Sequence, residues 1–149
     1  MSTSIPPVIR AAFVARPPTE AFAVFTEEIG AWWPLSTHGV FGADNDGLLF
    51  RDGKLVEIAT DGRENIWGEV LHWDPPNRLT ITWHPYPQPG ESSEVDVVFE
   101  GEGEGTRVTL EHRDWEAFGE QAMAKRSVYV GPNAWGSLLD CFAGVADVA

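Results

Sequence analysis

The sequence predicts a single α+β domain in which a curved antiparallel sheet wraps around one long C-terminal helix. Between residues 48 and 113 the apolar residues alternate with the period of two that is typical of strands, and turns rich in Gly, Pro and Asp separate the segments. From residue 133 onward the apolar spacing becomes helical. Strands that meander and then give way to a helix favour an antiparallel layer over a parallel, doubly wound sheet. The length of 149 residues fits one domain, spanning residues 1–149.

The N-terminal part is expected to add one strand and two short helices. Residues 8–15 read as the first strand, and Pro18 suits the first turn of a helix that Gly30 ends. The strand's apolar residues Ile9, Ala11 and Phe13 share one face. Residues 34–47 have the composition of a loop.

About six further strands follow, with clear turn signals between them. They are expected at residues 48–51, 54–60, 64–73, 78–84, 94–100 and 106–113. Asp52-Gly53 is a strong hairpin dipeptide, and residues 85–90 form a Pro-rich loop. Residues 117–130 are ambiguous between a broken helix and a lid. The final helix is expected from Asn133, which can cap its start.

Composition excludes several classes of partner. The formal net charge is −13 and the acidic excess is spread along the chain, so binding to nucleic acid or to an anionic membrane is not expected. No apolar run approaches the length that spans a bilayer, and the N-terminus does not resemble a signal peptide. The single cysteine, Cys141, cannot form an intrachain disulfide. A cytoplasmic protein is therefore expected.

Several segments, in order along the chain, resemble a known family. They are Pro-Pro-Thr-Glu-Ala-Phe at 17–22, Trp-Trp-Pro at 32–34, Trp-Gly-Glu-Val at 67–70, Asp-Pro-Pro-Asn-Arg-Leu at 74–79, the stretch 105–112, and Trp135. The chain resembles the family named after the activator of the heat-shock-protein-90 ATPase, within the helix-grip superfamily (SRPBCC) of START and Bet v 1-like domains. The resemblance implies a sheet that grips the last helix and leaves a cavity between them. The superfamily includes lipid and hormone carriers, polyketide cyclases and resistance proteins.

Two adjacent tryptophans and one histidine are the first candidates for a ligand site. Trp32 and Trp33 are interpreted either as an aromatic gate at the cavity mouth or as a cover on one end of the core. Adjacent large aromatics at a helix end are expected to diverge, with one inward and one partly exposed. His112 is either a polar handle inside an apolar cavity or an imidazole satisfied by a backbone carbonyl. The predicted concave face consists of Leu79, Ile81, Trp83, Val97, Phe99, Val108, Leu110 and His112.

Strand 64–73 is harder to orient, because both of its faces are apolar enough to be buried. If Trp67 faces inward, alternation brings Glu69 with it, and a carboxylate in an apolar cavity could act as a general acid or base. The alternative is an exposed Glu69.

Tyr129 and Trp135 are interpreted either as a lid that closes the cavity or as packing at the helix start. The histidines lack metal-ligand spacing, so neither a metal nor another cofactor is expected.

Three functions remain open. The first is binding of a small hydrophobic molecule (a lipid, polyketide or aromatic compound) in the cavity. The second is a cyclase- or hydrolase-type enzyme that uses His112 or Glu69, and the third is a module that binds a protein partner such as a chaperone. The expected ligand-binding residues are Trp32, Trp33, Trp67, Glu69, Ile81, Trp83, Phe99, Leu110, His112, Tyr129 and Trp135.

Overall fold

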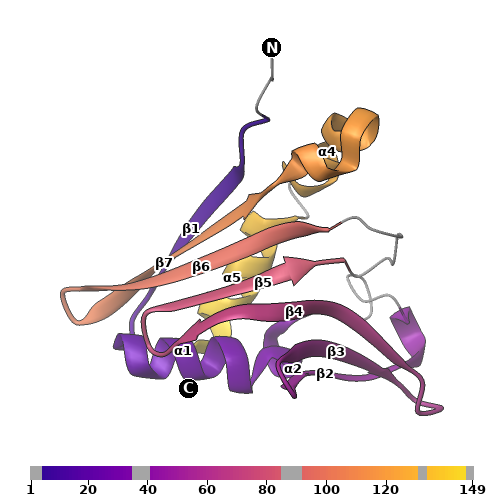
Figure 1. Cartoon of the computed structure of the whole chain (residues 1–149). Helices are drawn as coiled ribbons and strands as arrows, with labels where there is room; N and C mark the ends of the chain where they lie inside the picture. The colour runs from indigo at the N-terminus through magenta and orange to yellow at the C-terminus, as the bar shows by residue number, and fades with distance from the viewer. Residues whose placement is uncertain (1–4, 35–40, 85–91, 131–133, 147–149) are drawn as a thin grey trace.

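The computed structural model describes residues 5–34, 41–84, 92–130 and 134–146. It confirms the α+β helix-grip architecture (Figure 1). The strands are β1 (Val8–Val14), β2 (Asn45–Arg51), β3 (Lys54–Ala59), β4 (Glu64–Asp74), β5 (Arg78–Trp83), β6 (Ser93–Glu102) and β7 (Gly105–Arg113). The helices are α1 (Pro18–Glu27), α2 (Ile29–Trp32), α4 (Ala122–Val130) and α5 (Trp135–Ala146), with the 3₁₀ turns η1 (Gly42–Asp44) and η2 (Trp115–Gln121).

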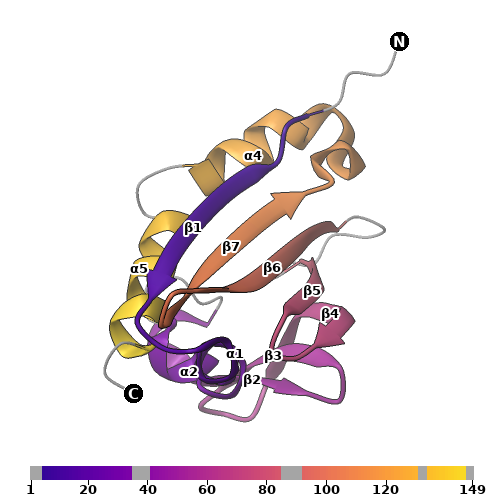
Figure 2. The ribbon, with the colours of Figure 1, turned by 90° about the vertical axis from the view of Figure 1, so that its left-hand side faces the viewer.

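The seven strands form one antiparallel sheet in the order β1-β7-β6-β5-β4-β3-β2. The first strand therefore lies at one edge and pairs with the last, so that Val8 lies opposite His112. The chain then crosses through α1 and α2 to the other edge and returns as a meander. Figure 2 shows the sheet curling, with α5 on its inner side and α1 and α2 at one end.

The final helix packs its apolar stripe into this curl. Its buried residues are Trp135, Leu138, Leu139, Phe142 and Ala146. α1 begins at Pro18, where the fixed φ of proline suits the first turn, and it buries Phe22 and Phe25 on the face toward the sheet. The two helices and the concave sheet face thus enclose one apolar core.

A glycine lies at an irregular part of the sheet, where β4 passes between β3 and β5. Leu55 lies opposite Gly68 and Val56 opposite Ile66, so Trp67 is an extra residue in β4, that is, a β-bulge. At Gly68 the backbone passes so close to β5 that a Cβ there would lie 1.8 Å from the Thr82 carbonyl oxygen. Only glycine fits this approach.

Most expected elements occur within a few residues of their predicted bounds. The segment 117–130 is a broken helix, interrupted at Gly119, whose φ of 57° is non-helical. β2 begins earlier than expected, at Asn45. The face of β1 formed by Ile9, Ala11 and Phe13 is the exposed one. The loop at 85–90 and the predicted cap Asn133 lie outside the described residues.

Candidate functional site

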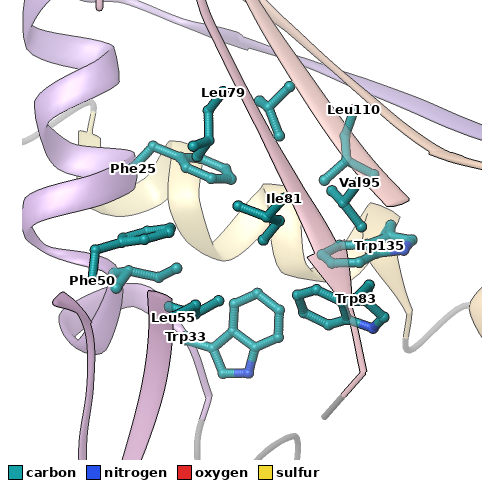
Figure 3. A pocket seen from close by; sticks show the side chains of 12 residues that line it. Phe25, Trp33, Phe50, Leu55, Leu79, Ile81, Trp83, Val95, Leu110 and Trp135 are labelled. Carbon is teal, nitrogen blue, oxygen red and sulfur yellow. The ribbon is translucent and has the colours of Figure 1, made fainter. Parts of the chain in front are cut away.

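The space between the sheet and α5 is walled by apolar side chains from both layers (Figure 3). Its lining consists of Phe25, Ile29, Trp33, Phe50, Leu55, Leu79, Ile81, Trp83, Val95, Val97, Leu110 and Trp135. The remaining void has a volume of about 10 Å³, at the lower limit for one water molecule. Aromatic rings therefore fill the cavity that the fold encloses.

Trp33 lies at the centre of this aromatic filling. Its ring packs edge-on against Trp67 and Trp135, with centroid separations of 5.2 and 5.8 Å, and lies 5.9 Å from the ring of Trp83. Its backbone is extended, with φ −75° and ψ 126°, directly after the single turn of α2. This change of backbone direction explains why the expected divergence of Trp32 and Trp33 is wrong. Both are buried, at 4% and 6% exposure, so neither is a gate at the surface.

His112 is the polar centre of the same region, on β7 behind Trp83 and Trp135. The Trp135 indole N–H donates to its Nδ1 at 3.0 Å, and its Nε2 lies 2.6 Å from the Ser93 hydroxyl. Because Nδ1 is an acceptor here, the neutral ring carries its proton on Nε2 and donates to Ser93. The Ser93 hydroxyl in turn points to the Trp83 carbonyl oxygen at 3.5 Å. These hydrogen bonds run in one direction from α5 through β7 and β6 to β5.

This environment keeps the imidazole neutral. Burial lowers the pKa of His112 from 6.5 to about 3, because the charged form would lose its hydration without gaining a counter-charge. The two ring nitrogens are held by an indole N–H and a hydroxyl, neither of which is a backbone carbonyl. His112 thus serves as a fixed hydrogen-bond centre, an arrangement that does not favour a role as a general base near neutral pH.

Tyr129 of α4 closes the other side of this group. Its hydroxyl accepts the indole N–H of Trp83 at 3.0 Å, and its ring lies 4.6 Å from the His112 ring. The Trp115 indole donates to the backbone carbonyl of His112 at 2.9 Å. The Tyr129 hydroxyl and the indole N–H groups of Trp83 and Trp135 therefore form hydrogen bonds within the protein beside the apolar wall.

Glu57 is a buried acid that the sequence reasoning missed. It is 0% exposed, and its carboxylate accepts from the Trp67 indole at 3.0 Å, the Asn45 amide at 2.8 Å and the Phe41 backbone N–H at 3.1 Å. The hydrogen bonds from these donors compensate the free-energy cost of removing the carboxylate from water. The signal was present, because Leu55, Glu57 and Ala59 alternate on the inward face of β3. Glu57 fixes the Trp67 ring and the start of β2.

Replacing Glu57 by Gln is expected to lower the free energy of unfolding by about 2 kcal/mol, because one carboxylate oxygen becomes a donor that faces other donors. Urea unfolding followed by tryptophan fluorescence measures this loss. The matched control is Glu64→Gln on the neighbouring strand, where the acid is exposed. Equal losses in the two variants would contradict a specific role for the buried carboxylate.

Of the two alternatives for Glu69 the structure shows the exposed one, so its place among the expected ligand-binding residues is wrong. Trp67 does face inward. The bulge at Trp67 and Gly68 breaks the alternation after it, however, so Glu69 is exposed. It takes no part in the lining.

The other expected site residues are all in the core or beside it. Those that line the void are Trp33, Ile81, Trp83, Leu110 and Trp135. Trp32, Trp67 and Phe99 lie one layer behind as ring contacts of the lining. The lining residues that the expected set lacks are Phe25, Ile29, Phe50, Leu55, Leu79, Val95 and Val97.

Among the described residues, no group of three or more His, Cys, Asp or Glu side chains is placed to hold a metal ion. None of the described helices is long and apolar enough to span a bilayer.

Comparison with known proteins identifies the family. The model of the family "Activator of Hsp90 ATPase homolog 1-like protein" matches residues 15–146. No curated protein matches the chain at a significant level. Among solved structures, the chain is 33% identical to Txn09, an anthrahydroquino-gamma-pyrone synthase complexed with SUM, with a TM-score of 0.64 and coverage of 97% of this chain and 99% of that one.

A second similar structure is CalC from Micromonospora echinospora, described as a self-sacrificing resistance protein. It is 28% identical, with a TM-score of 0.67 and coverage of 96% of this chain and 95% of that one. The family match covers most of the chain and agrees with the observed fold. The chain therefore belongs to the family of Activator of Hsp90 ATPase homolog 1-like proteins.

Proposed function

We propose that this protein binds a small hydrophobic or aromatic molecule between the sheet and α5. The observation that carries the proposal is the composition of the interior wall, which is apolar and aromatic throughout. The Tyr129 hydroxyl, which accepts the Trp83 indole N–H, lies nearby as a polar group. This combination is typical of sites for small organic ligands.

The comparisons support the same class of ligand. The name of the 33% identical protein refers to an anthrahydroquino-gamma-pyrone, an aromatic compound, and that protein was solved in a complex. An interior rich in indole and phenyl rings provides edge and face contacts for such a ring system.

Binding requires a side chain to leave the interior, because a ligand site of this kind needs roughly 300 Å³ or more and the present void is about 10 Å³. Trp33 is the best candidate. Trp67 and Trp83 are carried by strands inside the sheet and Trp135 by α5, whereas Trp33 follows a helix of four residues. Its displacement breaks neither the sheet nor α5. In this proposal the Trp33 ring occupies the place of the ligand when none is bound.

A thermal-shift screen of the purified protein against lipids, flavonoids, polyketides and aromatic acids tests the binding. A ligand at a hundred times its Kd is expected to stabilise the fold by about 2.7 kcal/mol, which raises Tm by several degrees. The same ligand is expected to bind Trp33→Ala more tightly than the wild type, because the variant has no ring to displace.

Trp115→Ala is the matched control, since Trp115 is also a buried tryptophan but does not line the void. Its affinity for the ligand is expected to stay close to that of the wild type. A screen without any shift would overturn the proposed function. If both alanine variants bind the ligand more tightly, the proposal that the Trp33 ring occupies the ligand site is contradicted. The tighter binding would then come from a general loosening of the core.

A further inference from the structure

A second hollow lies on the outside of the molecule, directly behind one end of the apolar interior. It has a volume of about 310 Å³ and is lined by Phe50, Arg51, Asp52, Gly53, Val70 and Trp73. We call it the hairpin groove, because most of its lining belongs to the β2–β3 hairpin. Its volume falls within the range of small-molecule sites.

Phe50 is the residue that the hairpin groove shares with the interior lining. In Figure 3 it lies at the opposite end of the lining from Trp135, next to Leu55 and Phe25. One phenyl ring thus borders both the filled interior and the open groove.

The floor of the groove continues into the core as a series of ring contacts. Trp73 is 47% exposed, and its ring lies 5.5 Å from Phe50 and 5.4 Å from Phe22. Phe22 in turn lies 5.1 Å from Phe99, which contacts Phe25 at 5.6 Å. An aromatic molecule in the groove would therefore meet aromatic surface at each step inward.

The position of Phe50 in the sheet allows its ring to move. β2 is an edge strand, and within the part of the chain that the structure describes it pairs with β3 alone. The hairpin is anchored at its tip, where the Val70 N–H donates to the Gly53 carbonyl at 2.8 Å. A rotation of Phe50 about its side-chain bonds, or a small shift of β2, would leave this anchor and the central strands intact.

We propose that the hairpin groove is the access route to the interior and that the Phe50 ring is its gate. This inference rests on the proposed function, since it concerns the ligand of the same interior. The ligand class that fits the route is an uncharged planar aromatic molecule. Arg51 at the rim forms an ion pair with Glu64 and so does not offset Asp52; Asp52 and the net charge of −13 disfavour anions. The wholly apolar lining of the interior disfavours a charged group of either sign.

Stopped-flow binding of N-phenyl-1-naphthylamine, an uncharged fluorescent aromatic probe, tests the gate in the full chain. Energy transfer from tryptophan reports binding. Phe50→Ala is expected to raise both the association and the dissociation rate constants at least about tenfold, with a smaller change in Kd. Phe50→Trp, which enlarges the gate ring, is expected to lower both rate constants.

Phe13→Ala is the matched control. Phe13 lies on β1, the opposite edge strand, and is 51% exposed. Its truncation also removes a phenyl ring from a sheet edge, far from the groove, and is expected to leave both rate constants unchanged. Thermal unfolding of each variant checks that the fold is retained.

The outcomes separate the two proposals. Faster exchange in Phe50→Ala and slower exchange in Phe50→Trp support the gate. If the probe raises the Tm of the wild type but neither Phe50 variant changes the rate constants, the gate is overturned and the binding function stands. Equal acceleration in Phe13→Ala also overturns the gate. If neither the probe nor any compound of the thermal-shift screen binds or raises Tm, the binding function fails and the gate with it.

Discussion

Replacing Gly68 by Ala is expected to destabilise the protein by at least about 3 kcal/mol, more than a typical overpacked site. The added Cβ would lie 1.8 Å from the carbonyl oxygen of Thr82 and 2.9 Å from its carbonyl carbon. Both atoms belong to the backbone of a central strand, so no side-chain rotation relieves the clash. Either β4 and β5 separate or the bulge is lost, and in both cases Trp67 leaves its buried position. The midpoint of urea unfolding measures the loss, and near-UV circular dichroism reports the displaced tryptophan.

Gly47→Ala provides the control for the effect of alanine in a strand of the same sheet. Gly47 lies in β2, and a Cβ added there would meet no atom within 4 Å. This substitution is expected to be neutral or stabilising by up to about 1 kcal/mol, because alanine restricts the unfolded chain. Similar unfolding midpoints for the two variants would contradict the close approach of β4 and β5.

The free energy of unfolding is expected to fall as the pH is lowered from 6.5, owing to His112. Burial lowers the pKa of His112 to about 3 in the folded protein, whereas an unfolded histidine titrates near 6.5. Between these values the unfolded chain binds a proton that the folded chain does not. Acidification therefore favours unfolding by about 1.4 kcal/mol per pH unit, or about 2 kcal/mol between pH 7 and 5. Above pH 6.5 this contribution to stability is fully present.

His112→Asn isolates the contribution of His112 titration to the pH dependence of stability. Asparagine does not titrate, and its amide oxygen can accept the Trp135 indole N–H. We expect it to be less stable than the wild type at pH 7, and we expect the difference to shrink by about 2 kcal/mol at pH 5. Urea unfolding at several pH values measures both. A constant difference across this range would contradict a neutral, buried His112.

The buried carboxylate of Asp96 does not interfere in this window. Burial alone would raise the pKa of Asp96, but hydrogen bonds from Arg78 and Thr80 and the charges of Arg78 and Arg113 hold that pKa below its usual value. The contribution of Asp96 to stability is therefore present above about pH 4 and is lost only as the pH falls further. Changes in the free energy of unfolding between pH 7 and 5 therefore do not include the loss of the Asp96 contribution.

The architecture could be predicted from the sequence because its signals are local and repeated. The alternation of Leu79, Ile81 and Trp83 identified β5 and its buried face, and the helical spacing after Trp135 identified α5. Both patterns depend on regular elements, in which a residue's face follows from its number alone.

The site was less predictable because its details depend on departures from regularity. The bulge at Gly68 leaves Glu69 exposed although Trp67 of the same strand is buried, which regular alternation does not allow. Nothing in the sequence of one strand shows how closely another strand approaches. The extended backbone at Trp33 buries two adjacent indoles that regular geometry would separate. That these rings would fill the cavity could not be foreseen, since packing across layers is set by tertiary contacts.

The close packing of indoles around Trp33 also determines the tryptophan fluorescence of the protein. Five of the seven tryptophans form one connected set of ring contacts, with centroids 5.0–5.9 Å apart: Trp32, Trp33, Trp67, Trp83 and Trp135. Excitation passes between rings at such separations faster than an indole emits, so the five act as one shared chromophore. A molecule that accepts excitation from any of them quenches all. The depth of quenching therefore reports whether the interior is occupied, and not which ring the occupant touches.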